Sequence, residues 1–123
     1  MDMETKEGMI EYCKMVCEKN NWILNKDEVI FDDLIDGLVS NKKEYGYQSC
    51  PCRLASGNRD LDRDLICPCD YAPLDVKEFN ACYCNLYLHP DFYDSGVIYV
   101  LVPERRPEDK DKGLLDYFSQ QLD

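Results

Sequence analysis

The first part of the chain has hydrophobic residues at helical spacing. Met9, Ile10, Cys13, Val16 and Cys17 recur at intervals of three and four residues, which predicts a helix over about residues 6–20 with one buried face. Cys13 and Cys17 lie on that face. Because a free cysteine behaves as a small hydrophobe, we expect both to pack in the core.

A second helix is predicted to follow. Asn25 to Glu28 resemble a capping box, so the helix should start near Asn25, and Gly46 should end it. Its apolar face comprises Ile30, Phe31, Leu34, Ile35 and Leu38. Residues 1–46 are therefore predicted to form a helical foundation, and nothing in them indicates a reaction.

From residue 47 the pattern breaks into short segments rich in Pro, Asp and Gly, which is typical of loops. Asn58 is placed to cap a brief helix through Ile66, with Leu61 and Leu65 facing inward. Another short helical turn is predicted from Asp75 to Phe79.

The last third combines strand and helix signals. Residues 85–89 and 96–102 have strand-like composition, and the second segment is rich in β-branched side chains around Tyr99, which predicts a strand there. Pro107 is suited to the first position of a terminal helix, whose apolar face would comprise Leu114, Leu115, Phe118 and Leu122. The pattern predicts a small, α-rich α+β fold in one domain, residues 1–123, with 47–102 as the functional region and 103–123 as the C-terminal helix.

Charge and hydropathy argue against several classes of function. The formal net charge of -11 argues against binding to nucleic acid, which needs basic surface. The longest apolar stretch, 97–102, is too short to cross a bilayer, and the first residues lack the features of a signal peptide. We therefore expect a cytoplasmic protein, in which closely spaced cysteines are metal ligands or catalytic thiols rather than structural disulfides.

Six of the eight cysteines form three C-x-C pairs, at positions 50 and 52, 67 and 69, and 82 and 84. Four thiolates suffice for a structural zinc ion or a [4Fe-4S] cluster, so two thiols are left over. Two free thiols can exchange with the disulfide of another protein. Three functions remain open at this point: a disulfide reductase, a binding module held by zinc, and a one-electron carrier.

The order of the pairs resembles the catalytic (beta) chain of the ferredoxin–thioredoxin reductase family, whose pattern is C-P-C, C-P-C and C-H-C. The resemblance covers about residues 47–102 and implies helices packed around a loop-held [4Fe-4S] cluster. The implied cluster ligands are Cys50, Cys67, Cys69 and Cys82. It also implies that Cys52 and Cys84 form a redox-active disulfide, with Cys52 as the exposed nucleophile and Cys84 against the cluster.

The implied reaction takes single electrons from ferredoxin and reduces the disulfide of thioredoxin or a similar protein. Whether a variable subunit accompanies the chain stays open. Tyr83 departs from the family pattern, because a histidine there can carry a positive charge beside the disulfide and a tyrosine cannot. Arg53 and the only histidine, His89, are candidates to supply that charge, with an ordinary surface or turn position as the alternative for each.

Overall fold

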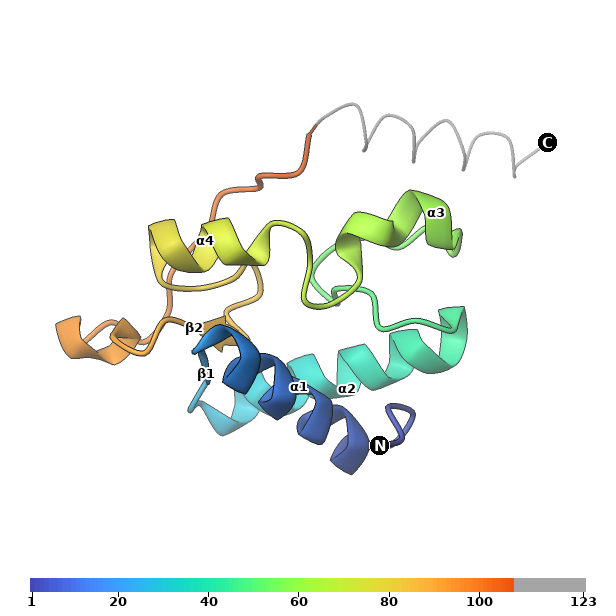
Figure 1. Ribbon diagram of the computed structural model, residues 1–123, viewed down its shortest axis with the longest axis horizontal. Coiled ribbons are helices and arrows are strands. Elements are labelled where there is room, and N and C mark those ends of the chain that lie inside the picture. The colour runs from blue at the N-terminus through green and yellow to red at the C-terminus, as the bar shows by residue number, and fades with distance from the viewer. Residues whose placement is uncertain (108–123) are drawn as a thin grey trace.

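Two long helices form one side of the molecule. The computed structural model describes residues 1–107, in which α1 (Lys6–Asn20) and α2 (Glu28–Tyr45) pack against each other. In Figure 1 they lie together below α3 and α4. The predicted C-terminal helix falls outside the described residues.

The ends of these helices follow local capping. The Thr5 side chain accepts a hydrogen bond from the Gly8 amide, and Asn21 closes α1 in the left-handed conformation, so the predicted bounds are confirmed. The predicted cap at Asn25 is wrong. Asp27 caps α2, because its carboxylate accepts from the amides of Val29 and Ile30, whereas the Asn25 side chain accepts from the Asp27 amide.

Short helices form the opposite side. They are α3 (Arg59–Asp62), which continues into a 3-10 turn, and α4 (Ala72–Phe79). Asn58 caps α3 as predicted. Leu65 is fully buried, but Leu61 is 36% exposed, so its predicted inward orientation is wrong. The tighter 3-10 winding after one helical turn changes which residues share a face.

Two strands join the sides. β1 (Ile23–Leu24) pairs antiparallel with β2 (Tyr87–Leu88), and Ile23 lies opposite Leu88. β2 lies within the segment of strand-like composition, residues 85–89. β1 was not predicted, because two residues are too few to show the alternation of apolar and polar side chains that marks a strand. The predicted strand 96–102 is wrong, since this segment pairs with no strand among residues 1–107.

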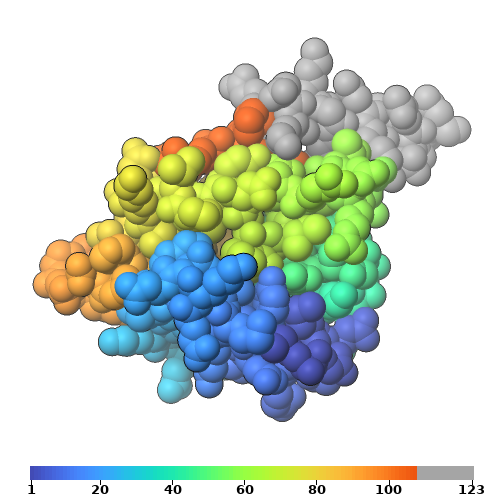
Figure 2. All heavy atoms as spheres, in the orientation of Figure 1, coloured from blue at the N-terminus to red at the C-terminus, as the bar shows by residue number. Residues whose placement is uncertain are grey.

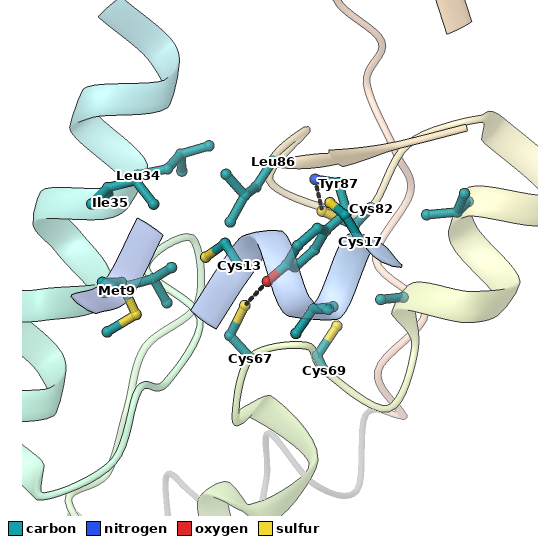
Figure 3. Packing of buried hydrophobic residues seen from close by; sticks show 14 residues of the cluster. Met9, Cys13, Cys17, Leu34, Ile35, Cys67, Cys69, Cys82, Leu86 and Tyr87 are labelled. Atoms are coloured by element: carbon teal, nitrogen blue, oxygen red, sulfur yellow. Dashed lines mark hydrogen bonds between the residues drawn. The ribbon is translucent and has the colours of Figure 1, made fainter. Parts of the chain in front are cut away.

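The core lies between the helices and contains many sulfurs. Cys13 and Cys17 are buried on α1 as predicted, in one cluster with Cys67, Cys69 and Cys82. Figure 3 shows these cysteines around the Tyr87 ring, and Figure 2 shows the α1 surface directly against the yellow-green surface of the α3 to α4 region. No described helix is long and apolar enough to cross a membrane.

Candidate redox site

Three loops carry the C-x-C pairs to one place. The first pair follows α2, the second follows the 3-10 turn, and the third lies between α4 and β2. Backbone hydrogen bonds join the first two loops: the Cys50 amide donates to the Leu65 carbonyl and the Cys67 amide to the Gln48 carbonyl, both at 2.8 Å. The third loop closes on itself through the Cys82 amide and the Tyr87 carbonyl, at 2.9 Å.

Five of the six paired cysteines line one closed pocket. Its remaining walls are mainly apolar, with Leu34, Ala72 and Leu86 among them. The five are Cys50, Cys67, Cys69, Cys82 and Cys84. The first four are 5–8% exposed. In residues 1–107 no three Cys, His, Asp or Glu side chains are grouped so as to hold a single metal ion; the sulfurs surround a space instead.

Cys52 lies in a different environment. It is exposed and lines an open groove of about 230 Å³. The other groove residues are Tyr83, Cys84, Tyr99, Leu101 and Val102. Cys84 thus lines both the closed pocket and the groove, and its Sγ lies 3.0 Å from the Sγ of Cys50. All eight cysteines are free thiols in the structure.

The thiols differ in acidity because their surroundings differ. Hydrogen bonds from the side chains of Cys50 and Cys84 hold the pKa of Cys52 well below its usual range, whereas hydrogen bonds with Cys50 and with Cys52 raise the pKa of Cys84. Desolvation by burial raises the pKa of Cys82 to about 12 and raises that of Cys67 strongly. Cys52 therefore combines exposure with thiolate character, the two properties of a nucleophilic cysteine.

Several donors face the buried sulfurs. The Tyr87 amide donates to Cys82 Sγ at 3.3 Å, and Arg53 Nη1 donates to Cys69 Sγ at 3.5 Å. The Cys67 thiol donates to the Tyr87 hydroxyl oxygen at 3.8 Å (Figure 3). Four buried cysteine sulfurs, two of them with such donors, fit a [4Fe-4S] cluster, since cysteine is its usual ligand and hydrogen bonds to sulfur tune it.

Arg53 is a buried cation beside the site. Its side chain is only 4% exposed and pairs with Glu104 at 2.7 Å, so an ordinary surface position is excluded. Its guanidinium also stacks over the Tyr83 ring, 4.1 Å from the ring centre. His89 lines neither the pocket nor the groove, and its Nδ1 accepts from the Asp91 amide in the turn after β2.

Two residues of the site, Gly37 and Tyr87, were not predicted from the sequence. A Cβ atom at Gly37 would lie 2.7 Å from the Pro51 Cβ, so only glycine lets α2 approach the first C-P-C loop so closely. A glycine inside a helix is a recognisable signal for such contact. Tyr87 gave no signal, because its apolar surroundings hid the role of its hydroxyl.

The chain is similar to proteins of one known family. A family model described as "Ferredoxin thioredoxin reductase catalytic beta chain" matches residues 2–98. The chain belongs to this family. The family predicted from the order of the C-x-C pairs is thus confirmed, and residues 99–107 lie beyond the reductase match.

Curated relatives agree with the family match. Each is named "Ferredoxin-thioredoxin reductase, catalytic chain". The protein of Pyropia yezoensis is 26% identical over 88 residues, which are 72% of this chain and 74% of the relative. The Guillardia theta protein is 26% identical over 84 residues, 68% and 80% of the two chains. The Cyanidium caldarium protein is 33% identical over 72 residues, 57% and 61% of the two chains.

Proposed function

We propose that this chain is a disulfide reductase that takes single electrons from ferredoxin and reduces the disulfide of thioredoxin or a similar protein. The observation that carries the proposal is the division of the six paired sulfurs between two sites. Four line only the closed pocket, Cys52 lines only the open groove, and Cys84 lines both. Such a division suits a buried electron store joined to an exposed thiol.

The closed pocket would hold the iron–sulfur group. We assign as its ligands Cys50, Cys67, Cys69 and Cys82, the four that the order of the C-x-C pairs implies by resemblance. A [4Fe-4S] cluster bound there would supply electrons one at a time. The chain excludes water from it with apolar walls and directs the Tyr87 amide and the Arg53 guanidinium at two of the sulfurs.

The groove would carry out thiol–disulfide exchange. The Cys52 thiolate attacks one sulfur of the target disulfide, the target S–S bond breaks, and the other target sulfur leaves as a thiolate. The Cys84 thiolate then attacks the Cys52 sulfur, which releases the reduced target and leaves a Cys52–Cys84 disulfide. Two electrons have passed to the target, and two electrons from ferredoxin reopen the Cys52–Cys84 bond.

Arg53 would supply the positive charge that histidine offers in the family pattern. Its guanidinium packs on Tyr83, the residue between the last two cysteines, and reaches Cys69. A nearby cation favours thiolate over thiol. The side chain of Tyr83 would therefore act by positioning that cation rather than by carrying a charge.

Metal and thiol analysis tests the proposal. Anaerobically purified protein should contain about four irons and four labile sulfides per chain, as the cluster type requires. Mild reduction should expose two further thiols. The variants Cys52→Ser and Cys84→Ser should each keep the iron, the sulfide and the brown colour but lose ferredoxin-dependent thioredoxin reduction. The matched control is Cys17→Ala, at a buried cysteine outside the pairs, and it should keep the iron, the sulfide and the reductase activity.

Two results would decide for other functions. A colourless protein that contains zinc and no sulfide would contradict the proposal in favour of a structural zinc module. In the other result the parent protein reduces no disulfide, while a double variant with Cys52→Ser and Cys84→Ser transfers electrons as fast as the parent does. That result would identify a one-electron carrier.

A further inference from the structure

The segment from Val97 to Val102 exposes unusual apolar surface. Leu101 is 81% exposed and Ile98 77%, the two highest values among the exposed large apolar side chains of residues 1–107, and Tyr99 is 50% exposed. Contiguous exposed apolar residues mark binding surfaces more often than isolated ones do. The segment runs beside the proposed nucleophile, because Tyr99 and Leu101 line the same groove as Cys52.

Asn85 fixes this segment in place. Its buried side-chain amide donates to the Val100 carbonyl at 2.8 Å and accepts from the Val100 amide at 3.1 Å. Since Asn85 directly follows Cys84, the segment is tied to the reactive pair itself. Tyr99 and Leu101 flank Val100, so in an extended chain they point to the same side, toward the groove.

We propose that Tyr99 and Leu101 form a docking wall that binds apolar residues flanking the disulfide of the protein substrate. The inference rests on the proposed function, because Cys52 can attack only a target sulfur that enters this groove. A groove of about 230 Å³ holds few side chains, so residues next to the target cystine must contact Tyr99 and Leu101. Apart from the reacting Cys52 thiolate, these groove walls carry no charged side chain, and an apolar partner segment matches them.

The backbone of the segment favours an extended partner. Within residues 1–107 the peptide groups of Ile98, Tyr99 and Leu101 make no backbone hydrogen bond. An extended peptide can bond to such groups as an added strand while its side chains fill the groove.

The docking wall lies outside the part of the chain that defines the family. The family match ends at residue 98, so Cys52, Tyr83 and Cys84 fall inside it and Tyr99 and Leu101 fall beyond it. The exchange chemistry is thus carried by residues inside the family match, whereas the proposed docking wall lies directly after it.

Exchange rates with a large and a small disulfide test the proposal. Full-length holoprotein is reduced anaerobically and mixed with oxidised thioredoxin or with oxidised glutathione, and the second-order rate constant is measured for each. Leu101→Ser and Tyr99→Ser should each lower the constant for thioredoxin about tenfold, equivalent to about 1.4 kcal/mol, and change that for glutathione less than about twofold. Ile98→Ser is the matched control, because Ile98 is exposed on the same segment but does not line the groove.

Each remaining outcome overturns the inference. Equal losses for Ile98→Ser, or no loss for either groove variant, would show that the segment does not bind the substrate. Parallel losses for both disulfides would show that it acts on Cys52 reactivity instead. A dimer that Leu101→Ser converts to monomer in light scattering, with unchanged thioredoxin kinetics, would assign the surface to a second copy. If the parent reduces thioredoxin and both groove variants reduce it equally fast, only this inference fails; if the parent does not reduce thioredoxin, the proposed function fails as well.

Discussion

Cys52 differs from the other five paired cysteines in two ways that reinforce each other. It lines only the open groove, and the thiols of Cys50 and Cys84 donate to its sulfur and lower its pKa. The sulfurs of Cys67 and Cys82 have the opposite environment, where desolvation raises the pKa and the protonated form persists without a bound cation. A single side chain is therefore equipped to start the exchange with a target disulfide.

This acidity should appear in alkylation of the reduced protein prepared without iron, in which the Cys50 thiol keeps the proton that it donates to Cys52. Because the pKa of Cys52 is lowered, its thiolate persists as the pH falls, and its rate with iodoacetamide should change less than about twofold between pH 8 and pH 6. Glutathione in the same solution, with a pKa near 8.5, should slow by nearly two orders of magnitude. Peptide mapping identifies the modified cysteine. A Cys52 rate that falls in parallel with that of glutathione would contradict the lowered pKa.

At the scale of elements, Asn85 connects the third C-x-C pair to the segment that follows it. Its backbone adopts a positive φ of 62°, which Asn tolerates better than most residues. This conformation turns the buried amide toward Val100. One residue therefore sets both the geometry after Cys84 and the place of the docking wall.

Replacement of Asn85 by glycine separates these two roles. Asn85→Gly keeps the positive φ but removes two hydrogen bonds, so unfolding should require about 2 kcal/mol less free energy. The Val100 amide should also exchange its hydrogen faster, as measured by NMR. Asn80→Gly is the matched control, since Asn80 has a φ of 65° and an exposed side chain, and it should be nearly neutral. Equal effects of both variants would assign the loss to the backbone alone.

The sequence predicted elements where local rules decide and missed those that depend on tertiary contact. The stripe around Cys13 and the cap at Asn58 act within a few residues, so α1 and α3 were found. β1 exists only because β2 lies beside it. The strand expected at 96–102 failed for the same reason, because strand composition alone provides no partner.

The residues of the site were also predicted where local sequence order decides and missed where tertiary contact does. The fixed order of the C-x-C pairs predicted which sulfurs gather, and all six paired cysteines lie around the pocket or the groove. Tyr99 and Leu101 come from a distant part of the chain, and no spacing relates them to Cys52. Arg53 was a candidate from its position after Cys52, but its burial depends on Glu104, 51 residues away.

At the scale of the whole molecule, three successive residues fasten the chain beyond the family match to separate elements. Glu104 pairs with Arg53 near the first C-P-C loop, Arg105 pairs with Asp75 on α4, and Arg106 pairs with Asp64 in the 3-10 turn. The pair of Arg106 and Asp64 is the most buried, with side chains 2% and 3% exposed. These three contacts hold residues 104–106 against the elements that surround the site.

Loss of the buried pair should cost considerable stability. Arg106→Gln would remove the guanidinium that binds the buried Asp64 carboxylate, which costs about 3 kcal/mol and should lower the thermal midpoint by roughly 10 °C. Arg63→Gln is the control, because the Arg63 and Asp60 side chains are 78% and 85% exposed, and it should shift the midpoint by no more than about 2 °C. Scans are compared anaerobically at one heating rate. Similar shifts of the midpoint for both variants would mean that the pair of Arg106 and Asp64 adds little to the free energy of unfolding.

The stacking of Arg53 on Tyr83 has a consequence for cells whose internal acidity changes. A guanidinium keeps its proton at every physiological pH, whereas an imidazole gains and loses one near neutrality. The electric field that Arg53 places on the sulfurs is therefore constant when the surroundings acidify. Where a histidine would act as a sensor of acidity beside the dithiol, this chain has a fixed charge that ignores it.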